Sequence, residues 1–241
     1  MLGFVLIVAF PIILGLGFGV AYGVSYRLSR GKELLDRFGI LLYPLFLTLP
    51  FAVALLTAFE EGIFTDVGVR LPQILGFSPL LSLIIALVGG VITGILLFYN
   101  ERFLSNFLYR FVLRFPLLRR PLEGGSEESM RQLQQNPLGL FLALSAFITF
   151  GEEFLWRGYL LNYLGQTLFM PLGISLLISS VSFGLIHYYF GLRNVLLKTL
   201  SGLIWGGLYW FTGSLVVCVI SHFTFDCAAV LVQARRPKVR Q

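Results

Sequence analysis

Charged residues are scarce in this chain of 241 residues: Asp, Glu, Lys and Arg make up 12% of it, and hydrophobic residues make up 57%. Soluble domains average about 25% charged and roughly 45 to 50% apolar residues, so this composition excludes an ordinary soluble domain and indicates a membrane protein. Cysteine is also rare. The only two, Cys218 and Cys227, are nine positions apart in one apolar run. A helix would separate them by about 13 Å, too far for a disulfide.

The chain contains several long runs of apolar residues. A helix that rises about 1.5 Å per residue needs about 20 apolar residues to cross a hydrocarbon core of roughly 30 Å. We therefore predict an all-α integral membrane protein in one domain over residues 1–241, a polytopic bundle of seven transmembrane helices with eight as the alternative count. The predicted spans cover residues 3–26, 39–59, 80–99, 138–164, 171–190, 194–212 and 214–233. We expect the first span to be retained, because no basic segment precedes it and no clear cleavage site follows it.

The placement of Lys and Arg indicates an orientation. They cluster after the first span, in the long loop after the third span and in the tail "RRPKVR", whereas the loops between these hold few. Cytoplasmic loops collect such residues, so we expect the N-terminus outside and the C-terminus in the cytoplasm of a prokaryotic cell, with the bundle in its inner membrane. The net charge of +6 fits contact with the lipid bilayer, and we expect no nucleic-acid partner.

The loop after the third span begins with "ERFLSNFLYRFVLRF", residues 101–115. Its polar positions Arg102, Asn106, Arg110 and Arg114 recur every four residues, while phenylalanines and leucines fill the other faces. This pattern predicts an interfacial amphipathic helix on the inner leaflet.

Ionisable residues inside the predicted spans are few and gather in the later ones. They are Glu152, Glu153 and Arg157 in the fourth span, His187 in the fifth, and His222 and Asp226 in the seventh. A charge at the centre of a span costs about 2.5 to 3.5 kcal/mol on insertion scales, so such residues usually face one another or a wet cavity. We therefore expect them to mark a functional site.

Helical spacing sorts these residues. Glu153 and Arg157 are four positions apart and share a helix face, whereas Glu152 lies about 140° from Arg157 and cannot easily pair with it on the same helix. A carboxylate that the arginine does not neutralise suits a general base. His222 and Asp226 are also four positions apart and share a face.

Each pattern also has a purely structural interpretation. Glu153 with Arg157 can serve only as a buried ion pair that fixes helix packing. His222 with Asp226 can serve as a hydrogen-bond clamp between helices. His187 lies near the cytoplasmic end of its span, where histidine is inexpensive, and can be a packing residue. Spacing alone leaves these alternatives open.

Three motifs on the late spans together resemble a known family. "EEFLWR" (Glu152 to Arg157) fits Glu-Glu-x-x-x-Arg, "FGLIH" (Phe183 to His187) fits Phe-x-x-x-His, and "HFTFD" (His222 to Asp226) fits His-x-x-x-Asn/Asp. In this order they resemble the CPBP family of CAAX proteases and bacteriocin-processing enzymes (also called ABI), which includes the type II CAAX prenyl endopeptidase. The resemblance covers residues 138–233, which are then the expected catalytic helices.

The resemblance implies a polytopic intramembrane endopeptidase whose site opens toward the cytosol. It implies a peptide or protein substrate, prenylated or otherwise membrane-bound, and no cofactor. Carried over to this chain, it gives Glu152 the task of activating water with help from His187, while Glu153 and Arg157 hold the geometry.

The same resemblance implies that His222 and Asp226 stabilise the tetrahedral oxyanion or orient the water. Some members of the family have Asn at the position of Asp226. An ionised Asp cannot donate a hydrogen bond to an oxyanion, whereas an amide can. We therefore favour an Asp226 that orients His222, which donates in its place.

Three other functions stand as alternatives. A zinc-dependent membrane metalloprotease is one, because Glu152, His187 and His222 make a two-His, one-carboxylate set, although a His-Glu-x-x-His motif is absent. A proton-coupled transporter would use the same residues as a relay, but the first three spans offer no polar path and the chain shows no internal repeat. A non-catalytic immunity or scaffold protein of the same family would keep the fold without the chemistry.

Overall fold

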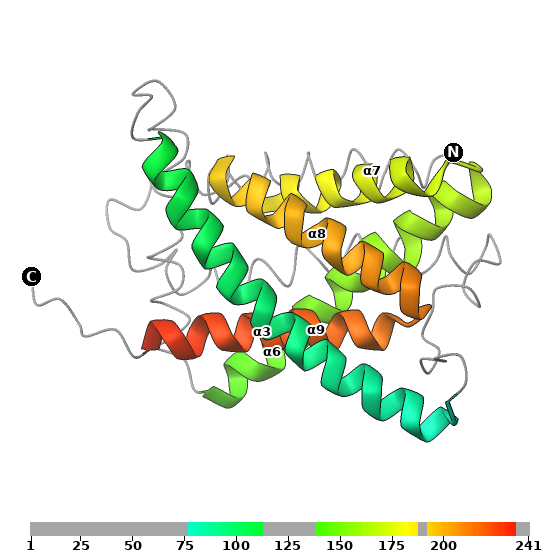
Figure 1. The fold of residues 1–241 in the computed structure, drawn as a ribbon, viewed down its shortest axis with the longest axis horizontal. Coiled ribbons are helices and arrows are strands. Elements are labelled where there is room, and N and C mark those ends of the chain that lie inside the picture. The colour runs from blue at the N-terminus through cyan, green and yellow to red at the C-terminus, as the bar shows by residue number, and fades with distance from the viewer. Residues whose placement is uncertain (1–76, 113–137, 188–191, 235–241) are drawn as a thin grey trace, which may run out of the picture.

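A computed structural model of the chain describes residues 77–112, 138–187 and 192–234 (Figure 1). Every regular element within these segments is a helix. The spans predicted at residues 3–26 and 39–59 lie outside the described residues, as does the expected retention of the first span. Helices occupy the described parts of the remaining five predicted spans, and the count of seven stays a prediction.

The helices follow the predicted spans closely. In chain order they are α3 (Pro79–Val112), α6 (Leu138–Glu153), the π-helical segments η3 (Phe154–Leu161) and η4 (Tyr163–Thr167), α7 (Leu172–Leu185), α8 (Leu192–Thr212) and α9 (Leu215–Ala234). The span predicted at 138–164 is thus divided among α6, η3 and η4. By length and composition, α3 over Pro79–Leu108 and α9 over Leu215–Val232 are each long and apolar enough to cross a membrane.

Helix α3 extends well beyond the span predicted at 80–99. Its 34 residues reach about 51 Å at about 1.5 Å per residue, more than the hydrocarbon core of roughly 30 Å requires. The amphipathic helix predicted at 101–115 is not a separate interfacial element, because residues 101–112 continue α3 without a break. Glu101 holds this extension to α8, since its Oε2 accepts hydrogen bonds from Lys198 at 3.1 Å and from Ser201 at 3.2 Å.

Helices α7 and α8 lie side by side (Figure 1) because small residues let their backbones approach each other. A Cβ atom on Gly202 would lie 3.1 Å from Cβ of Ser180, and one on Gly206 would lie 2.8 Å from Cδ2 of Leu176. Lipid tails are as apolar as leucine, so membrane helices associate through close packing of this kind.

A second pair of glycines brings α3 against α9, which it crosses in Figure 1. Gly90 and Gly94 are four positions apart on one face of α3. A Cβ on Gly90 would lie 3.1 Å from the backbone oxygen of Val217, and one on Gly94 would collide with the backbone oxygen of Ser221. Ser221 precedes His222, so this contact fixes the part of α9 that carries the histidine.

The helix that begins as α6 widens directly after Glu153. In η3 and η4 the backbone hydrogen bonds span five residues, a form that is rare and frequent at functional sites. Leu168 N–H, for example, donates to the Tyr163 carbonyl at 3.1 Å. The Asn162 side chain donates to the Gly158 carbonyl at 2.7 Å. All eight residues of η3 are buried, so the widened segment forms part of the core.

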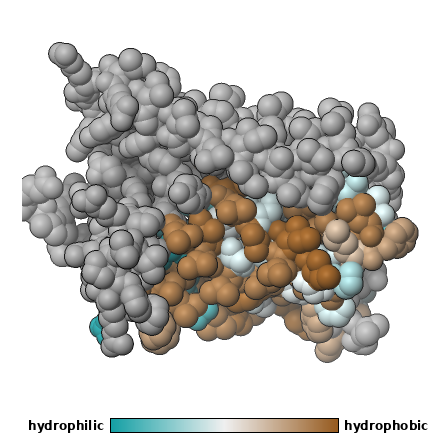
Figure 2. All heavy atoms as spheres, turned by 90° about the horizontal axis from the view of Figure 1, so that it is seen from above, coloured by the Kyte–Doolittle hydropathy of each residue, from teal (hydrophilic) through white to brown (hydrophobic). Residues whose placement is uncertain are grey.

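The outside of the described bundle is apolar. Large hydrophobic side chains are exposed at helical spacing, including Ile174, Leu177 and Val181 on α7 and Leu196, Leu200 and Ile204 on α8. Figure 2 shows one face on which such side chains form a nearly continuous surface. Soluble monomers rarely expose more than a few hundred Å² of contiguous apolar surface, so this face fits contact with lipid.

Candidate active site

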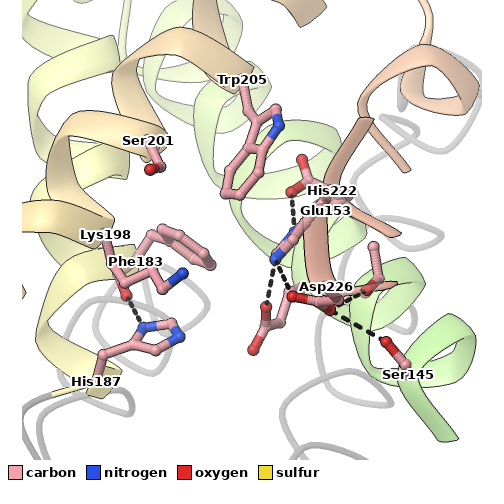
Figure 3. A network of polar contacts seen from close by, with 12 residues as sticks. Ser145, Glu153, Phe183, His187, Lys198, Ser201, Trp205, His222 and Asp226 are labelled. Carbon is pink, nitrogen blue, oxygen red and sulfur yellow. Dashed lines mark hydrogen bonds and ion pairs between the residues drawn. The ribbon is translucent and has the colours of Figure 1, made fainter. Parts of the chain in front are cut away.

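Polar side chains from α6, η3 and α9 converge inside the bundle (Figure 3). The structure brings together five of the six residues predicted from the sequence, namely Glu152, Glu153, Arg157, His222 and Asp226. All of them except Asp226 are buried, with at most 3% of their surface exposed. Charged groups buried this deeply are stable only when they neutralise and hydrogen-bond one another.

The predicted pair of Glu153 and Arg157 is present. Arg157 Nη1 lies 3.2 Å from Glu153 Oε1, and its Nη2 donates to the Gly202 carbonyl on α8 at 3.2 Å. The guanidinium carbon also lies 4.5 Å from the centre of the Phe183 ring, close enough for a cation–π interaction. Arg157 thus joins η3 to α7 and α8, and it balances the charge of one of the two adjacent carboxylates.

Glu153 also fixes His222. The same oxygen, Oε1, lies 2.8 Å from His222 Nδ1. A carboxylate that is ion-paired with arginine accepts hydrogen bonds, so Nδ1 of His222 carries the proton. The other ring nitrogen, Nε2, is on the side of Glu152 and Asp226. We had favoured Asp226 as the residue that orients His222. The structure instead gives this hydrogen bond to Glu153.

Two carboxylates face the other ring nitrogen of His222. Nε2 lies 3.7 Å from Glu152 Oε2 and 3.9 Å from Asp226 Oδ1. Both distances exceed a direct hydrogen bond, and both are within the span of one bridging water. The arrangement can therefore hold a water molecule against a carboxylate and an imidazole, which is what hydrolysis by an activated water requires.

Asp226 is held from the opposite side by α6. Ser145 Oγ and Thr149 Oγ1 each lie 3.1 Å from Asp226 Oδ2. The Asp226 side chain is 30% exposed, compared with 4% for Glu152 and for His222. Asp226 therefore occupies the most open side of the cluster.

Aromatic rings enclose the polar groups. Trp205 of α8 stacks on His222 with ring centroids 4.0 Å apart, and Phe183 of α7 meets His222 edge to face at 5.8 Å. Trp205 and Phe183 are both completely buried. Such rings keep bulk water from the histidine, and water exclusion strengthens the electrostatic interactions inside the site.

His187 lies on the α7 side of Phe183, whereas His222 lies on the α9 side (Figure 3). The Phe183 ring contacts both, at centroid distances of 5.0 Å to His187 and 5.8 Å to His222. His187 Nδ1 is 3.0 Å from the Phe183 carbonyl, which can only accept, so Nδ1 carries the proton. In the neutral ring Nε2 is then an acceptor.

Sequence reasoning missed Trp205, Ser145 and Thr149. A signal for the two hydroxyl residues was present, because Ser145, Thr149, Glu153 and Arg157 form one polar stripe with a period of four in an otherwise apolar helix. Nothing comparable marks Trp205, since tryptophan is common in apolar spans for packing alone.

Whether the cluster could hold a metal ion depends on how its side chains are arranged. Within the described residues, no group of three or more His, Cys, Asp and Glu side chains is arranged to hold one. His222 Nδ1 is bound to Glu153, whereas His222 Nε2 lies 3.7 Å from Glu152 Oε2. The zinc set of Glu152, His187 and His222 stays an alternative to a metal-free site.

Comparison with known protein families agrees with the motifs. Residues 134–228 match the family model described as type II CAAX prenyl endopeptidase Rce1-like. This match agrees with the resemblance of the three motifs to the CPBP family. The matched region contains all six predicted site residues and ends two residues after Asp226. No curated protein and no solved structure matches the chain. The matched family is one of peptidases, which agrees with the buried carboxylate and histidine cluster.

Proposed function

We propose that this protein is a CPBP-family intramembrane endopeptidase that hydrolyses a peptide bond with a water molecule activated by Glu152. The observation that carries the proposal is the position of Glu152 Oε2, 3.7 Å from a histidine nitrogen whose partner nitrogen is fixed on Glu153. A water hydrogen-bonded to both groups would be in contact with a base and an imidazole.

The proposed reaction uses this water as the nucleophile. Glu152 takes a proton from the water as its oxygen attacks the carbonyl carbon of the scissile peptide. The carbonyl electrons move onto oxygen, while His222 Nε2 accepts a hydrogen bond from the attacking water. As the tetrahedral intermediate collapses, the carbon–nitrogen bond breaks and Glu152 returns the proton to the leaving amine.

His187 keeps its predicted role as an assistant to the base within this proposal. Because its Nδ1 proton points to the Phe183 carbonyl, the neutral ring presents Nε2 as an acceptor for a peptide N–H or for the water. We propose no cofactor, since the side chains already provide a base and a hydrogen-bonding imidazole.

The substrate we propose is a peptide or protein segment held at the membrane, with a prenylated CAAX tail as the first candidate. The extensive apolar face suits a lipid-modified or membrane-bound chain that arrives within the bilayer. We also propose a prokaryotic inner membrane, with the N-terminus outside and the C-terminus in the cytoplasm, on the distribution of Lys and Arg.

The test is cleavage of a farnesylated CAAX peptide by purified protein in detergent. We expect the wild type to cleave it and Glu152→Gln to lose cleavage by at least about 100-fold while unfolding at the same temperature. The matched control is Glu101→Gln, which also removes a carboxylate from a helix of the bundle but one that lies outside the cluster. Equal cleavage by Glu152→Gln would contradict the assignment of the base. A well-folded wild type that cleaves neither prenylated peptides nor membrane-anchored precursors would favour the scaffold alternative.

A further inference from the structure

Two hydroxyl groups of α6 converge on a single oxygen of α9. Ser145 and Thr149 are one helical turn apart, and each places its side-chain oxygen 3.1 Å from Asp226 Oδ2. They belong to the polar stripe that continues through Glu153 to Arg157. Helix α6, which carries Glu152 and Glu153, therefore also binds Asp226 of α9.

The geometry indicates which oxygen of Asp226 accepts the two hydrogen bonds. A carboxylate oxygen can accept two hydroxyl hydrogens at once, whereas a protonated oxygen would have to donate to one of the two. Two convergent donors therefore identify Oδ2 as an acceptor that carries no proton. The contribution of Asp226 to the site then depends on where these donors place its other oxygen, Oδ1.

With Oδ2 hydrogen-bonded to α6, the other carboxylate oxygen, Oδ1, lies on the side of His222. Asp226 Oδ1 lies 3.9 Å from His222 Nε2, the nitrogen that Glu152 approaches at 3.7 Å. Asp226 is also the most exposed member of the cluster, with 30% of its side chain accessible. Without a tether, a side chain this exposed would turn toward water, which solvates a carboxylate better than any apolar wall.

We propose that Ser145 and Thr149 are positioning residues of the hydrolytic site. They act through Asp226, whose Oδ1 they hold beside His222 Nε2 so that the bridging water has an acceptor on two sides. This proposal rests on the proposed peptidase function for its effect on rate, but the tether itself is a property of the folded protein and is measurable without a substrate.

The kinetic test uses variants that remove or keep the hydroxyls. We expect the double variant Ser145→Ala, Thr149→Val to lower kcat by about 10- to 100-fold with little change in KM, because misplacement of a group at the reaction centre costs rate more than binding. Ser145→Thr and Thr149→Ser keep both donors and should retain most of the activity. Ser175→Ala is the matched control, since it removes a buried hydroxyl on α7 that donates to the Met170 carbonyl, outside the cluster.

A double-mutant cycle with Asp226 tests whether the two hydroxyls act through that residue. On an Asp226→Ala background, removing the two hydroxyls should cost nothing further, because the residue through which they act is already absent. Equal losses on the two backgrounds would overturn the proposal. So would a loss of the same size in Ser175→Ala, since this would show a general effect of removing buried hydroxyls.

Nuclear magnetic resonance of the histidines provides a readout independent of cleavage. The chain has only two histidines, so selective isotope labelling yields two ring signals, which His187→Gln assigns. We expect the Nε2 resonance of His222 to shift in the double hydroxyl variant and in Asp226→Ala alike, and to stay in place in Ser175→Ala. An unchanged His222 resonance in the double variant would overturn the tether. A shifted resonance in a protein that cleaves nothing would leave the tether standing and refute the peptidase.

Discussion

Trp205 and His222 stack face to face, with ring centroids 4.0 Å apart and an angle of 22° between the planes. The indole Nε1 also donates to Ser221 Oγ at 3.0 Å, one residue before the histidine. One side chain of α8 thus fixes both the ring plane of His222 and the adjacent turn of α9. With the Glu153 hydrogen bond at Nδ1, this leaves the imidazole a single orientation.

Replacing Trp205 should therefore affect both stability and rate. Trp205→Ala removes a completely buried ring, and we expect it to cost about 3 to 5 kcal/mol of unfolding free energy and most of the activity. Trp205→Phe keeps a stacking ring and loses only the bond to Ser221, so it should be much milder. Thermal unfolding in detergent and peptide cleavage measure the two effects. Trp210→Ala serves as control, because Trp210 is 62% exposed, and an equally large loss there would contradict the site-specific explanation.

The two adjacent carboxylates should behave differently when neutralised. Glu153→Gln leaves the buried Arg157 charge without its counter-charge, which costs about 3 to 5 kcal/mol, so we expect a clear fall in the unfolding temperature. Glu152→Gln keeps the Arg157–Glu153 pair and should leave that temperature nearly unchanged while abolishing cleavage. Adding Arg157→Met to Glu153→Gln should recover part of the stability. Similar unfolding temperatures for the two single variants would contradict the different tasks assigned to these residues.

The glycine contact between α3 and α9 gives a prediction about helix packing. Gly94→Ala places a methyl group against the Ser221 backbone oxygen and should lower both the unfolding temperature and the rate, because Ser221 adjoins His222. Gly89→Ala meets nothing within 4 Å and removes a helix-weakening glycine, so it should be neutral or slightly stabilising, by up to about 1 kcal/mol. The comparison requires only melting curves and cleavage rates of the two variants. Equal effects would show that the crossing is not tightly packed.

Removal of metal ions should not change the rate. Within the part of the chain that the structure describes, no group of three or more His, Cys, Asp and Glu side chains is arranged to hold a metal ion, so we expect cleavage to persist in the presence of a strong chelator. Activity before and after dialysis against the chelator measures this. Loss of activity with recovery on added zinc would place Glu152, His187 and His222 in a ligand shell and favour the metalloprotease alternative.

The local parts of the site were predictable from spacing. Residues four apart on a helix meet whatever the rest of the fold does, so the Glu153–Arg157 pair followed from the sequence alone and is confirmed. The apolar runs likewise predicted the helices from α6 to α9, because a span must satisfy its own backbone hydrogen bonds. The grouping of residues from the fourth and seventh spans followed from the cost of burying charge in lipid.

The contacts between helices were not predictable in the same way. Which residue binds His222 depends on the rotation of α9 against α6, and the sequence offered Asp226 on the same helix face while the structure uses Glu153. The end of the third span was also misjudged. The polar stripe after residue 101 indicated an interfacial helix, but Glu101 binds Lys198 and Ser201, and α3 continues in line.

The π-helical turns after Glu153 bear on which changes in chain length this protein can accept. Each backbone N–H there donates to the carbonyl five residues earlier, rather than four as in an α-helix. The segment η3 therefore contains more residues than an α-helix with the same number of turns. Deleting one residue between Glu153 and Arg157 would turn the arginine by about 100° away from its carboxylate. Substitutions among the apolar residues Phe154 and Leu155 keep that count. In related chains we therefore expect the residues of this segment to differ while its length stays the same.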